Sequence, residues 1–296
     1  MPRSGSLAKI TLVQEEVNPR EKGVNASWWG EVQVFPSGPF VRVLIKELDS
    51  RQLANELIAH SLCRVIGLPV PDAYIVINDG TLPEAMKGPV APDDLCGKMG
   101  FAAGRLLFAS AVCGNSFATT FGIPRRGEIA ETLFEAVRQH AIGEIRERLA
   151  GWPLLGIASA FDEWAAVIDR HAGNLLVGAN GEIWLIDHGH AFTGASWIAA
   201  DLRQIRFGNC LIEEAIQGSA SETLAYRVAD GAATLEENLA ANDTTLTGIE
   251  AAVQGLELIP GTDIAALRIF LSERRSRMYE FLEQSIEEAR KRITLG

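Results

Sequence analysis

The hydrophobic pattern of this chain changes once along its length, and that change limits the folds open to it. Before residue 115, apolar residues alternate with other residues at 10–17, 31–35 and 40–46, and apolar runs occupy 73–77 and 101–112; strands are predicted in all five segments. One helix is predicted among them, at 52–66, with Asp49 and Ser50 as candidate N-cap residues and Gly67 at its end. Residues 83–96 show no regular repeat and are predicted to form an irregular loop.

After residue 128 the apolar repeat becomes helical. It predicts helices at 129–149, 157–168, 196–207, 221–239, 245–256 and 264–293. The two patterns together predict an α+β fold with two lobes. A small β-rich lobe with one helix would occupy residues 1–120, and a larger, mainly helical lobe would occupy residues 121–296.

Composition narrows the class of partner. The formal net charge of −11 makes nucleic acid or an anionic membrane an unfavourable main partner. No stretch approaches the roughly 20 apolar residues of a membrane span, and no signal peptide is recognisable. The four cysteines match no zinc pattern, as expected for small buried side chains in a reducing cytoplasm, where we expect the protein to act.

The clearest chemistry lies between residues 169 and 189. The segment Asp169-Arg170-His171-Ala172-Gly173-Asn174 precedes one short apolar run, and Ile186-Asp187-His188-Gly189 ends a second run. Asn180-Gly181 between the runs predicts a tight hairpin turn. A hairpin brings its flanking residues to one end, so we expect Asn174 and Asp187 to face each other with Asp169 nearby. Oxygen ligands gathered in this way suit Mg²⁺ and the transfer of a phosphoryl group.

Asp169 is the candidate base for an acceptor hydroxyl, and Asn174 and Asp187 are the candidate metal ligands. Each of them alone also fits an ordinary turn or strand-end residue, but their joint placement around one hairpin favours the functional interpretation. His171 either stabilises developing charge or braces the loop. A metal site made of His171, His188 and His190 is disfavoured, because no cysteine accompanies them and a carboxylate–amide set suits a hard cation.

Two residues of the β-rich lobe are candidates for orienting phosphates. Lys46 ends a well-formed predicted strand, and Glu56 lies on the helix that follows. A strand lysine held by a helix glutamate directs its ammonium toward phosphate oxygens in protein kinases. The alternative is a solvated surface ion pair.

A phosphate-covering loop is the remaining candidate. The segment 18–30 contains Gly23, Asn25 and Ser27, whose backbone amides and hydroxyl would bind phosphate oxygens. No GxGxxG or Walker pattern is present, so an ordinary surface loop stays an equal alternative.

The order of these motifs resembles the HipA-like kinase family. Lys46, Asn55-Glu56-Leu57, Gly67-Leu68-Pro69-Val70-Pro71, Phe161-Asp162, Asp169-Arg170-His171-x-x-Asn174 and Ile186-Asp187-His188-Gly189 carry the likeness, over roughly residues 40–195. The Asp169 and Asp187 motifs are also similar to those of phosphoinositide 3- and 4-kinases. One departure is Val167, where many members of the family have asparagine.

The resemblance implies a two-lobed, protein-kinase-like fold with ATP and Mg²⁺ between the lobes. It implies Lys46 on the nucleotide phosphates with Glu56 as its partner, Asp169 as the catalytic aspartate, and Asn174 and Asp187 as metal ligands. It further implies phosphorylation of Ser or Thr in a protein substrate, and a possible regulatory protein partner, since some members are toxins restrained by an antitoxin.

Two alternatives stay open at this stage. One is a lipid or small-molecule kinase on the same scaffold, in which basic residues after Phe192 would bind the substrate; Arg203 and Arg206 are the candidates, although Asp201 is close. The other is a non-catalytic nucleotide-binding pseudokinase or scaffold, whose usual mark is the loss of a catalytic or metal residue. No such residue is lost here.

Overall fold

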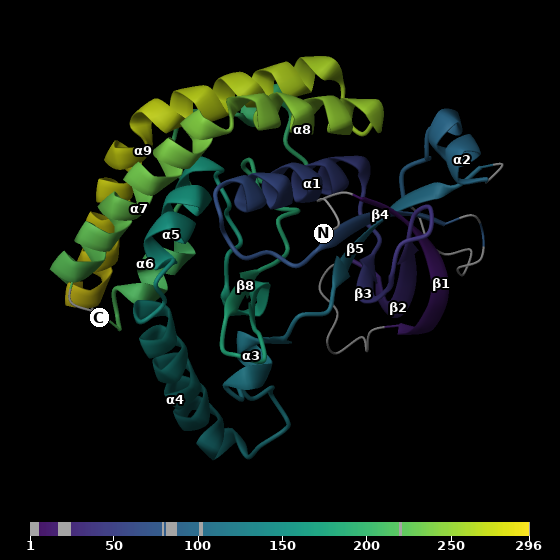
Figure 1. Cartoon of the computed structure of the whole chain (residues 1–296). Helices are drawn as coiled ribbons and strands as arrows, with labels where there is room; N and C mark the ends of the chain where they lie inside the picture. The colour runs from purple at the N-terminus through teal and green to yellow at the C-terminus, as the bar shows by residue number, and fades with distance from the viewer. Residues whose placement is uncertain are drawn as a thin grey trace.

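Five strands close into a barrel that forms the β-rich lobe of the protein (Figure 1). The computed structural model describes residues 6–16, 25–78, 80, 88–100, 103–218 and 221–295. The strands are β1 (Ser6–Glu16), β2 (Ser27–Val34), β3 (Phe40–Lys46), β4 (Ala73–Asn78) and β5 (Arg105–Ala111), in the order β1-β2-β3-β5-β4. Neighbouring strands are antiparallel except β1 and β4, which pair in parallel and close the barrel. The five predicted strands are therefore confirmed.

The barrel has its own small core, and its outer face joins a larger one. Val43 and Ile45 of β3 point inward with Trp28, Val32, Tyr74, Val76 and Leu107. Ile75, Ile77, Leu106 and Phe108 alternate with these along β4 and β5 and pack against helix α1 (Ser50–Val65). The predicted cap of α1 is confirmed, since the Asp49 carboxylate accepts a hydrogen bond of 2.8 Å from the backbone amide of Gln52.

The helical lobe surrounds the predicted hairpin. Strands β7 (Leu175–Val177) and β8 (Ile183–Leu185) pair antiparallel, and β6 (Asn115–Ser116) adds a third strand beside β7. Gly181 adopts a φ of +84° in the connecting turn, a conformation that favours glycine. The hairpin is thus confirmed. The domain boundary at residues 120 and 121 stays a prediction.

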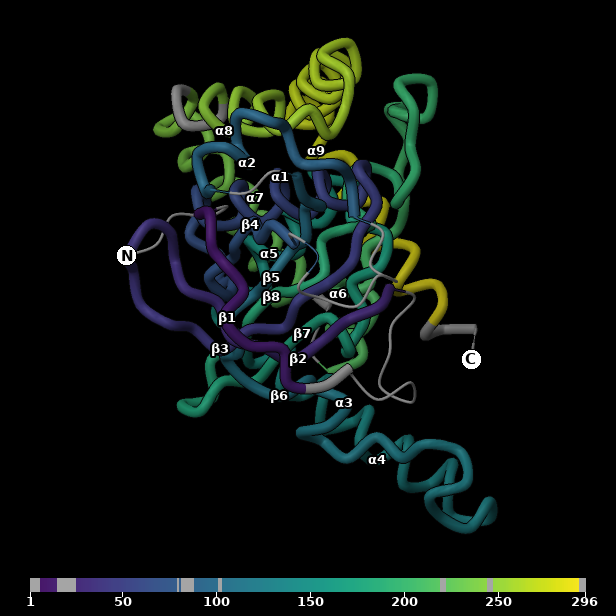
Figure 2. The backbone as a smooth tube through the Cα atoms, turned by 90° about the vertical axis from the view of Figure 1, so that its right-hand side faces the viewer, coloured from purple at the N-terminus to yellow at the C-terminus, as the bar shows by residue number. Residues whose placement is uncertain are grey.

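Long helices that pack on one another form most of the helical lobe. They are α4 (Glu131–Ala150), α5 (Leu155–Trp164), α7 (Ser221–Ala241), α8 (Asp243–Gly255) and α9 (Gly261–Leu295). Three helices are shorter: α2 (Asp93–Met99), which lies beside the barrel, α3 (Phe117–Thr120), which precedes α4, and α6 (Cys210–Ala215), which precedes α7. In Figure 1, α9 arches along the outside while α5 lies inside, and α4 projects away from the rest in Figures 1 and 2. Each helix in the described part of the chain is too short or too polar to span a lipid bilayer.

Helices α5 and α7 approach each other unusually closely. A Cβ atom on Gly231 of α7 would lie 2.1 Å from the backbone carbonyl carbon of Gly156, and one on Gly156 of α5 would lie 2.0 Å from the carbonyl oxygen of Arg227. Two facing glycines therefore allow the contact. This matters for the site, because the residues after α5 lead directly to Asp169.

Three sequence predictions for secondary structure were wrong in part. Residues 196–207 are not a helix but an irregular segment with one 3₁₀ turn, η2 (Ala199–Asp201), because side chains from α1 and α9 bind it at several points. The helix predicted at 157–168 ends at Trp164, since Ala166 adopts a φ of +47°. Within 83–96, residues 83–87 lie outside the described residues, and α2 begins at Asp93.

Candidate active site

The hairpin brings Asn174 and Asp187 to the same end. Asn174 closes the 3₁₀ turn η1 (Ala172–Asn174) directly before β7, and its carbonyl accepts a hydrogen bond of 3.1 Å from the amide of Ile186 after β8. Asp187 follows with a φ of +60°, a left-handed conformation that aspartate tolerates better than most residues. This backbone places its carboxylate 3.1 Å from the Nζ of Lys46, so β3 and the hairpin meet here.

Lys46 and Asp187 reinforce each other's charge. Burial by itself lowers the pKa of Lys46, but the carboxylates of Asp187 and Glu56 outweigh it, and the pKa of Lys46 is raised. The Lys46 ammonium holds the pKa of Asp187 below its usual range. The Asp187 side chain is 39% exposed and that of Lys46 12%, so the pair is open to a ligand chiefly from the aspartate side.

Glu56 lies close to this pair but differs from the prediction. Within the described part of the chain, the ion pair of Lys46 is formed with Asp187 and not with Glu56. Glu56 is buried and accepts a hydrogen bond from the backbone amide of His188, while its Oε2 has no partner among the described residues. Burial, eased by Lys46 and reinforced by Asp187, raises the pKa of Glu56 to about 7. When it is ionised, the Glu56 carboxylate therefore favours the charged form of Lys46 without forming an ion pair with it.

Asp169, His171 and Asn174 share one loop. The side-chain nitrogen Nδ2 of Asn174 donates a 2.6 Å hydrogen bond to the backbone carbonyl of Asp169, and the side-chain oxygen Oδ1 is left as an acceptor. His171 Nδ1 accepts a hydrogen bond of 2.9 Å from the amide of Gly173, and its Nε2 lies 3.7 Å from the Asp169 carboxylate. The Asp169 side chain is 45% exposed. The loop thus presents a carboxylate to solvent beside a fixed imidazole.

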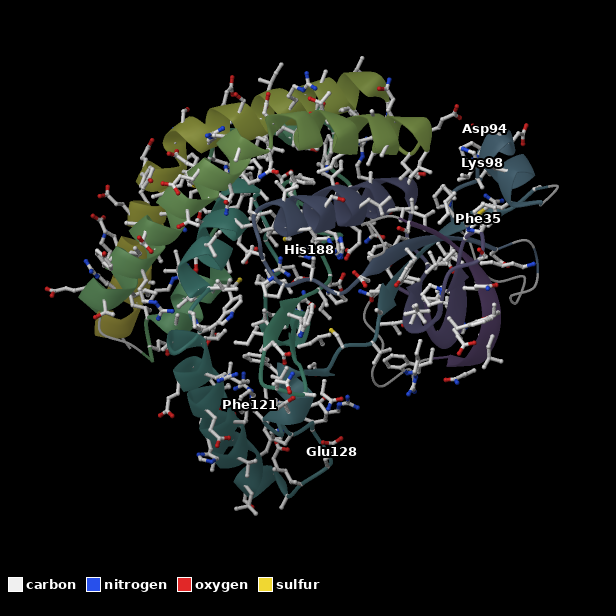
Figure 3. The ribbon with its side chains drawn as sticks, viewed as in Figure 1. Phe35, Asp94, Lys98, Phe121, Glu128 and His188 are labelled. Carbon is white, nitrogen blue, oxygen red and sulfur yellow. The ribbon has the colours of Figure 1, made fainter. Side chains whose placement is uncertain are left out.

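A buried arginine connects this loop to the segment after β8. Arg170 donates to both carboxylate oxygens of Asp162 at 3.2–3.3 Å, to the carbonyl of Ile186 at 2.7 Å and to His188 Nδ1 at 3.0 Å. Burial and the nearby guanidinium lower the pKa of His188 far below its usual range, so the ring is neutral. Arg170, the residue after Asp169, therefore binds both residues that flank Asp187, namely Ile186 and His188 (His188 is labelled in Figure 3).

Asn55 holds the segment that follows Asp187. Its amide nitrogen donates to the carbonyls of Gly189, Ala191 and Gly194 at 2.9–3.2 Å, and its oxygen accepts a 2.9 Å hydrogen bond from Trp197. Adjacent residues of α1, Asn55 and Glu56, thus bind the segment from 188 to 197. The sequence analysis assigned no role to Asn55, Asp162 or Arg170. All three lie within the motifs that carry the family resemblance, and this position was the one indication in the sequence that they matter.

The predicted phosphate loop is only partly described. Gly23 lies outside the described residues. Ser27, the first residue of β2, lies directly opposite Lys46 in the β2–β3 ladder and is buried, so the structure brings it beside the lysine. Asn25 lies in the bend before β2.

The donor set fits magnesium better than a softer metal. No group of three His, Cys, Asp or Glu side chains suited to a metal occurs among the described residues. The hairpin end instead offers an amide oxygen from Asn174 and a carboxylate from Asp187. Mg²⁺ is usually bound by one or two carboxylates together with water and phosphate oxygens. These residues therefore fit a magnesium–nucleotide pair.

No family model and no curated protein matches the sequence. Among solved structures, the chain is similar to the Helicobacter pylori proinflammatory kinase CtkA, with a TM-score of 0.49 and 12% identity over 95% of this chain and 98% of that one. A structural likeness at 12% identity assigns no substrate and no mechanism to this chain. The resemblance to HipA-like kinases stays a prediction.

Proposed function

We propose that this protein is an ATP- and Mg²⁺-dependent phosphotransferase whose acceptor is a hydroxyl group. One observation carries the proposal: Lys46 of the barrel lies 3.1 Å from Asp187 at the end of the hairpin. Asn174 lies at the same end, and its side-chain amide binds the backbone carbonyl of Asp169, whose carboxylate is exposed. A cation, two hard oxygen donors and a free carboxylate are the parts that phosphoryl transfer requires.

The residues divide the work by their chemistry. Asn174 and Asp187 would hold Mg²⁺, and Lys46 would bind phosphate oxygens. When bound, Mg²⁺ and ATP supply a transferable phosphoryl group with its charge neutralised. Asp169 accepts the proton of the acceptor hydroxyl, since its carboxylate is exposed and its loop is held by Asn174 and Arg170. Catalysis then comes mainly from positioning and electrostatics.

A protein Ser or Thr is our first choice of acceptor. A lipid kinase needs a free basic segment for an anionic head group, and the segment after Phe192 contains Arg203 and Arg206. Arg206 contacts Glu288 and donates to Ser285, so α9 already neutralises it. A pseudokinase is disfavoured because Lys46, Asp169, Asn174 and Asp187 are all present.

The direct test is transfer of labelled phosphate from MgATP. The whole chain is incubated with the label, alone and with a mixture of proteins, with phosphoinositide vesicles, or with small polyols. We expect label in protein, lost in Asp169→Asn and Asp187→Asn and kept in Glu135→Gln, an exposed acid on α4. Label in lipid or polyol would replace the acceptor, and no transfer in any arm would contradict the proposal.

A further inference from the structure

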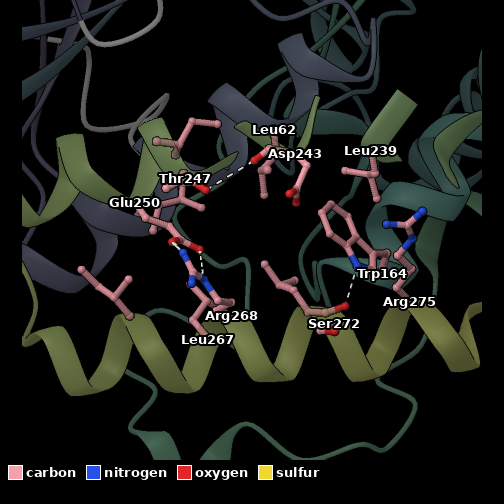
Figure 4. A pocket seen from close by; sticks show the side chains of 14 residues that line it. Leu62, Trp164, Leu239, Asp243, Thr247, Glu250, Leu267, Arg268, Ser272 and Arg275 are labelled. Atoms are coloured by element: carbon pink, nitrogen blue, oxygen red, sulfur yellow. Dashed lines mark hydrogen bonds and ion pairs between the residues drawn. The ribbon is translucent and has the colours of Figure 1, made fainter. Parts of the chain in front are cut away.

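A cavity of about 340 Å³ lies where α8 and α9 cover α1 and the end of α5 (Figure 4). Its floor is apolar and comes from four helices, with Leu62 of α1, Trp164 of α5, Leu239 of α7 and Leu267 of α9. The volume is at the lower end of the range for ligand pockets, about 300–1,000 Å³. The cavity therefore suits one small molecule, and the proposed phosphate transfer makes no use of it.

The two helices at the mouth of the cavity carry opposite charges. Asp243 and Glu250 line it from α8, and Arg268 and Arg275 line it from α9. Both pairs are symmetric about the turn between the helices: Glu250 and Arg268 are nine residues before and after Ile259, and Asp243 and Arg275 are sixteen residues before and after it. In two antiparallel helices joined by a turn, residues equally far from the turn lie opposite each other. This predicts that Glu250 lies opposite Arg268 and that Asp243 lies opposite Arg275.

Only the first of these matched pairs is closed, as judged within the described part of the chain. Arg268 donates to both carboxylate oxygens of Glu250, as the dashed lines in Figure 4 show. Asp243 and Arg275 have no opposite charge within ion-pair distance among the described residues, and Arg275 donates to a backbone carbonyl, that of Glu236, at 3.1 Å. An acid and a base that have no ion-pair partner among the described residues thus flank an apolar floor.

We propose that this cavity binds a free apolar α-amino acid in its zwitterionic form. The ammonium group would pair with Asp243 and the carboxylate would accept hydrogen bonds from Arg275. The side chain would cover Ile249 and Leu271, the partly buried apolar residues of the lining, beside the buried Leu62 and Trp164. A fatty acid or a simple amine would satisfy one charge and leave the other unpaired beside it. The apolar floor selects against polar side chains.

The bound amino acid would contact two helices that adjoin the candidate active site. Leu62 belongs to the helix of Asn55 and Glu56. Trp164, whose indole nitrogen donates a 2.9 Å hydrogen bond to the carbonyl of Leu271, ends α5 five residues before Asp169. The proposal of an amino-acid site in this cavity follows from the charges and shape of the cavity and does not depend on the proposed function.

The first experiment compares ligands on the unmodified chain. L-leucine and L-phenylalanine are titrated by calorimetry and by tryptophan fluorescence, beside L-leucinamide, which lacks the carboxylate, and 4-methylpentanoate, which lacks the ammonium. We expect one of the two amino acids to bind, and both single-charge analogues to bind at least about tenfold more weakly, because each loses a charge-assisted contact. Equal affinity for either analogue, or no binding of either amino acid at about 10 mM, would overturn the proposal.

The second experiment tests the charges in the protein. Asp243→Asn and Arg275→Gln should each weaken amino-acid binding by about tenfold. The double variant Glu135→Gln with Arg138→Gln removes an exposed ion pair of α4 that does not line the cavity, at unchanged net charge, and should bind within about twofold of the original. Unchanged affinity in both single variants would refute the assignment. If a variant fails to fold, the ligand comparison still decides the matter.

Discussion

Removal of the Asp162 carboxylate should strongly destabilise the protein, because Arg170 would be left as an uncompensated buried charge. The side chain of Arg170 is 0% exposed and that of Asp162 1%, and three hydrogen bonds of 3.2–3.3 Å join them. Breaking a buried pair on one side typically costs about 3–5 kcal/mol. Arg170 keeps the Ile186 carbonyl and His188 Nδ1 as acceptors, so we expect the lower end for Asp162→Ala, about 3 kcal/mol.

The assay is urea unfolding of the wild type, Asp162→Ala and the double variant Asp162→Leu with Arg170→Met. An apolar replacement of a whole buried pair is often neutral, so the double variant should recover most of the lost stability. It should nevertheless lose phosphate transfer, because the Ile186 carbonyl and His188, on either side of Asp187, would both lose their hydrogen bonds from Arg170. Glu280→Ala, which breaks an exposed pair with Arg277, should leave the midpoint nearly unchanged. A loss below about 1 kcal/mol in Asp162→Ala, or no recovery in the double variant, would refute this reasoning.

Three further predictions concern other parts of the molecule. Asn55→Ala should lower the free energy of unfolding by at least about 2 kcal/mol and weaken ATP binding, because three loop carbonyls lose their donor; unchanged ATP affinity in a calorimetric titration would contradict this. Gly231→Ala should destabilise by about 1–3 kcal/mol in urea unfolding through its clash with α5, whereas Gly248→Ala on α8, which meets open space, should be neutral or stabilising. Burial raises the pKa of Glu56 from 4.5 to about 7, so the folded state favours its neutral form; stability from this source is present below pH 4.5 and is lost as the pH rises through about 7. Unfolding at pH 5 and pH 8 should therefore show Glu56→Gln gaining on the wild type at the higher pH, and a constant difference would contradict it.

Features set by local rules could be predicted from the sequence. The cap at Asp49, the alternation in β3 and the turn at Gly181 depend on neighbouring residues, and each appears in the structure as expected. The hairpin turn also carried the main prediction for the site, because antiparallel pairing alone brings Asn174 and Asp187 to one end.

Features set by distant contacts could not be predicted in this way. Asn55 binds a carbonyl 139 residues away, and Arg274 binds the carbonyl of Ile205 in the segment that was predicted to be a helix. The ion pair of Lys46 with Asp187 in place of Glu56 depends on the positive φ of Asp187, which no sequence repeat reveals. In each case tertiary hydrogen bonds or charges outweigh local preference.

The most direct test of the account is the magnesium dependence of ATP binding, measured by calorimetry on the whole chain. We predict that Mg²⁺ tightens ATP binding in the wild type, and that Asp187→Asn removes this gain while Lys46→Met weakens ATP binding with or without the metal. ATP affinity that is the same with Mg²⁺ and with a chelator, or unaffected by the loss of Asp187, would contradict the account.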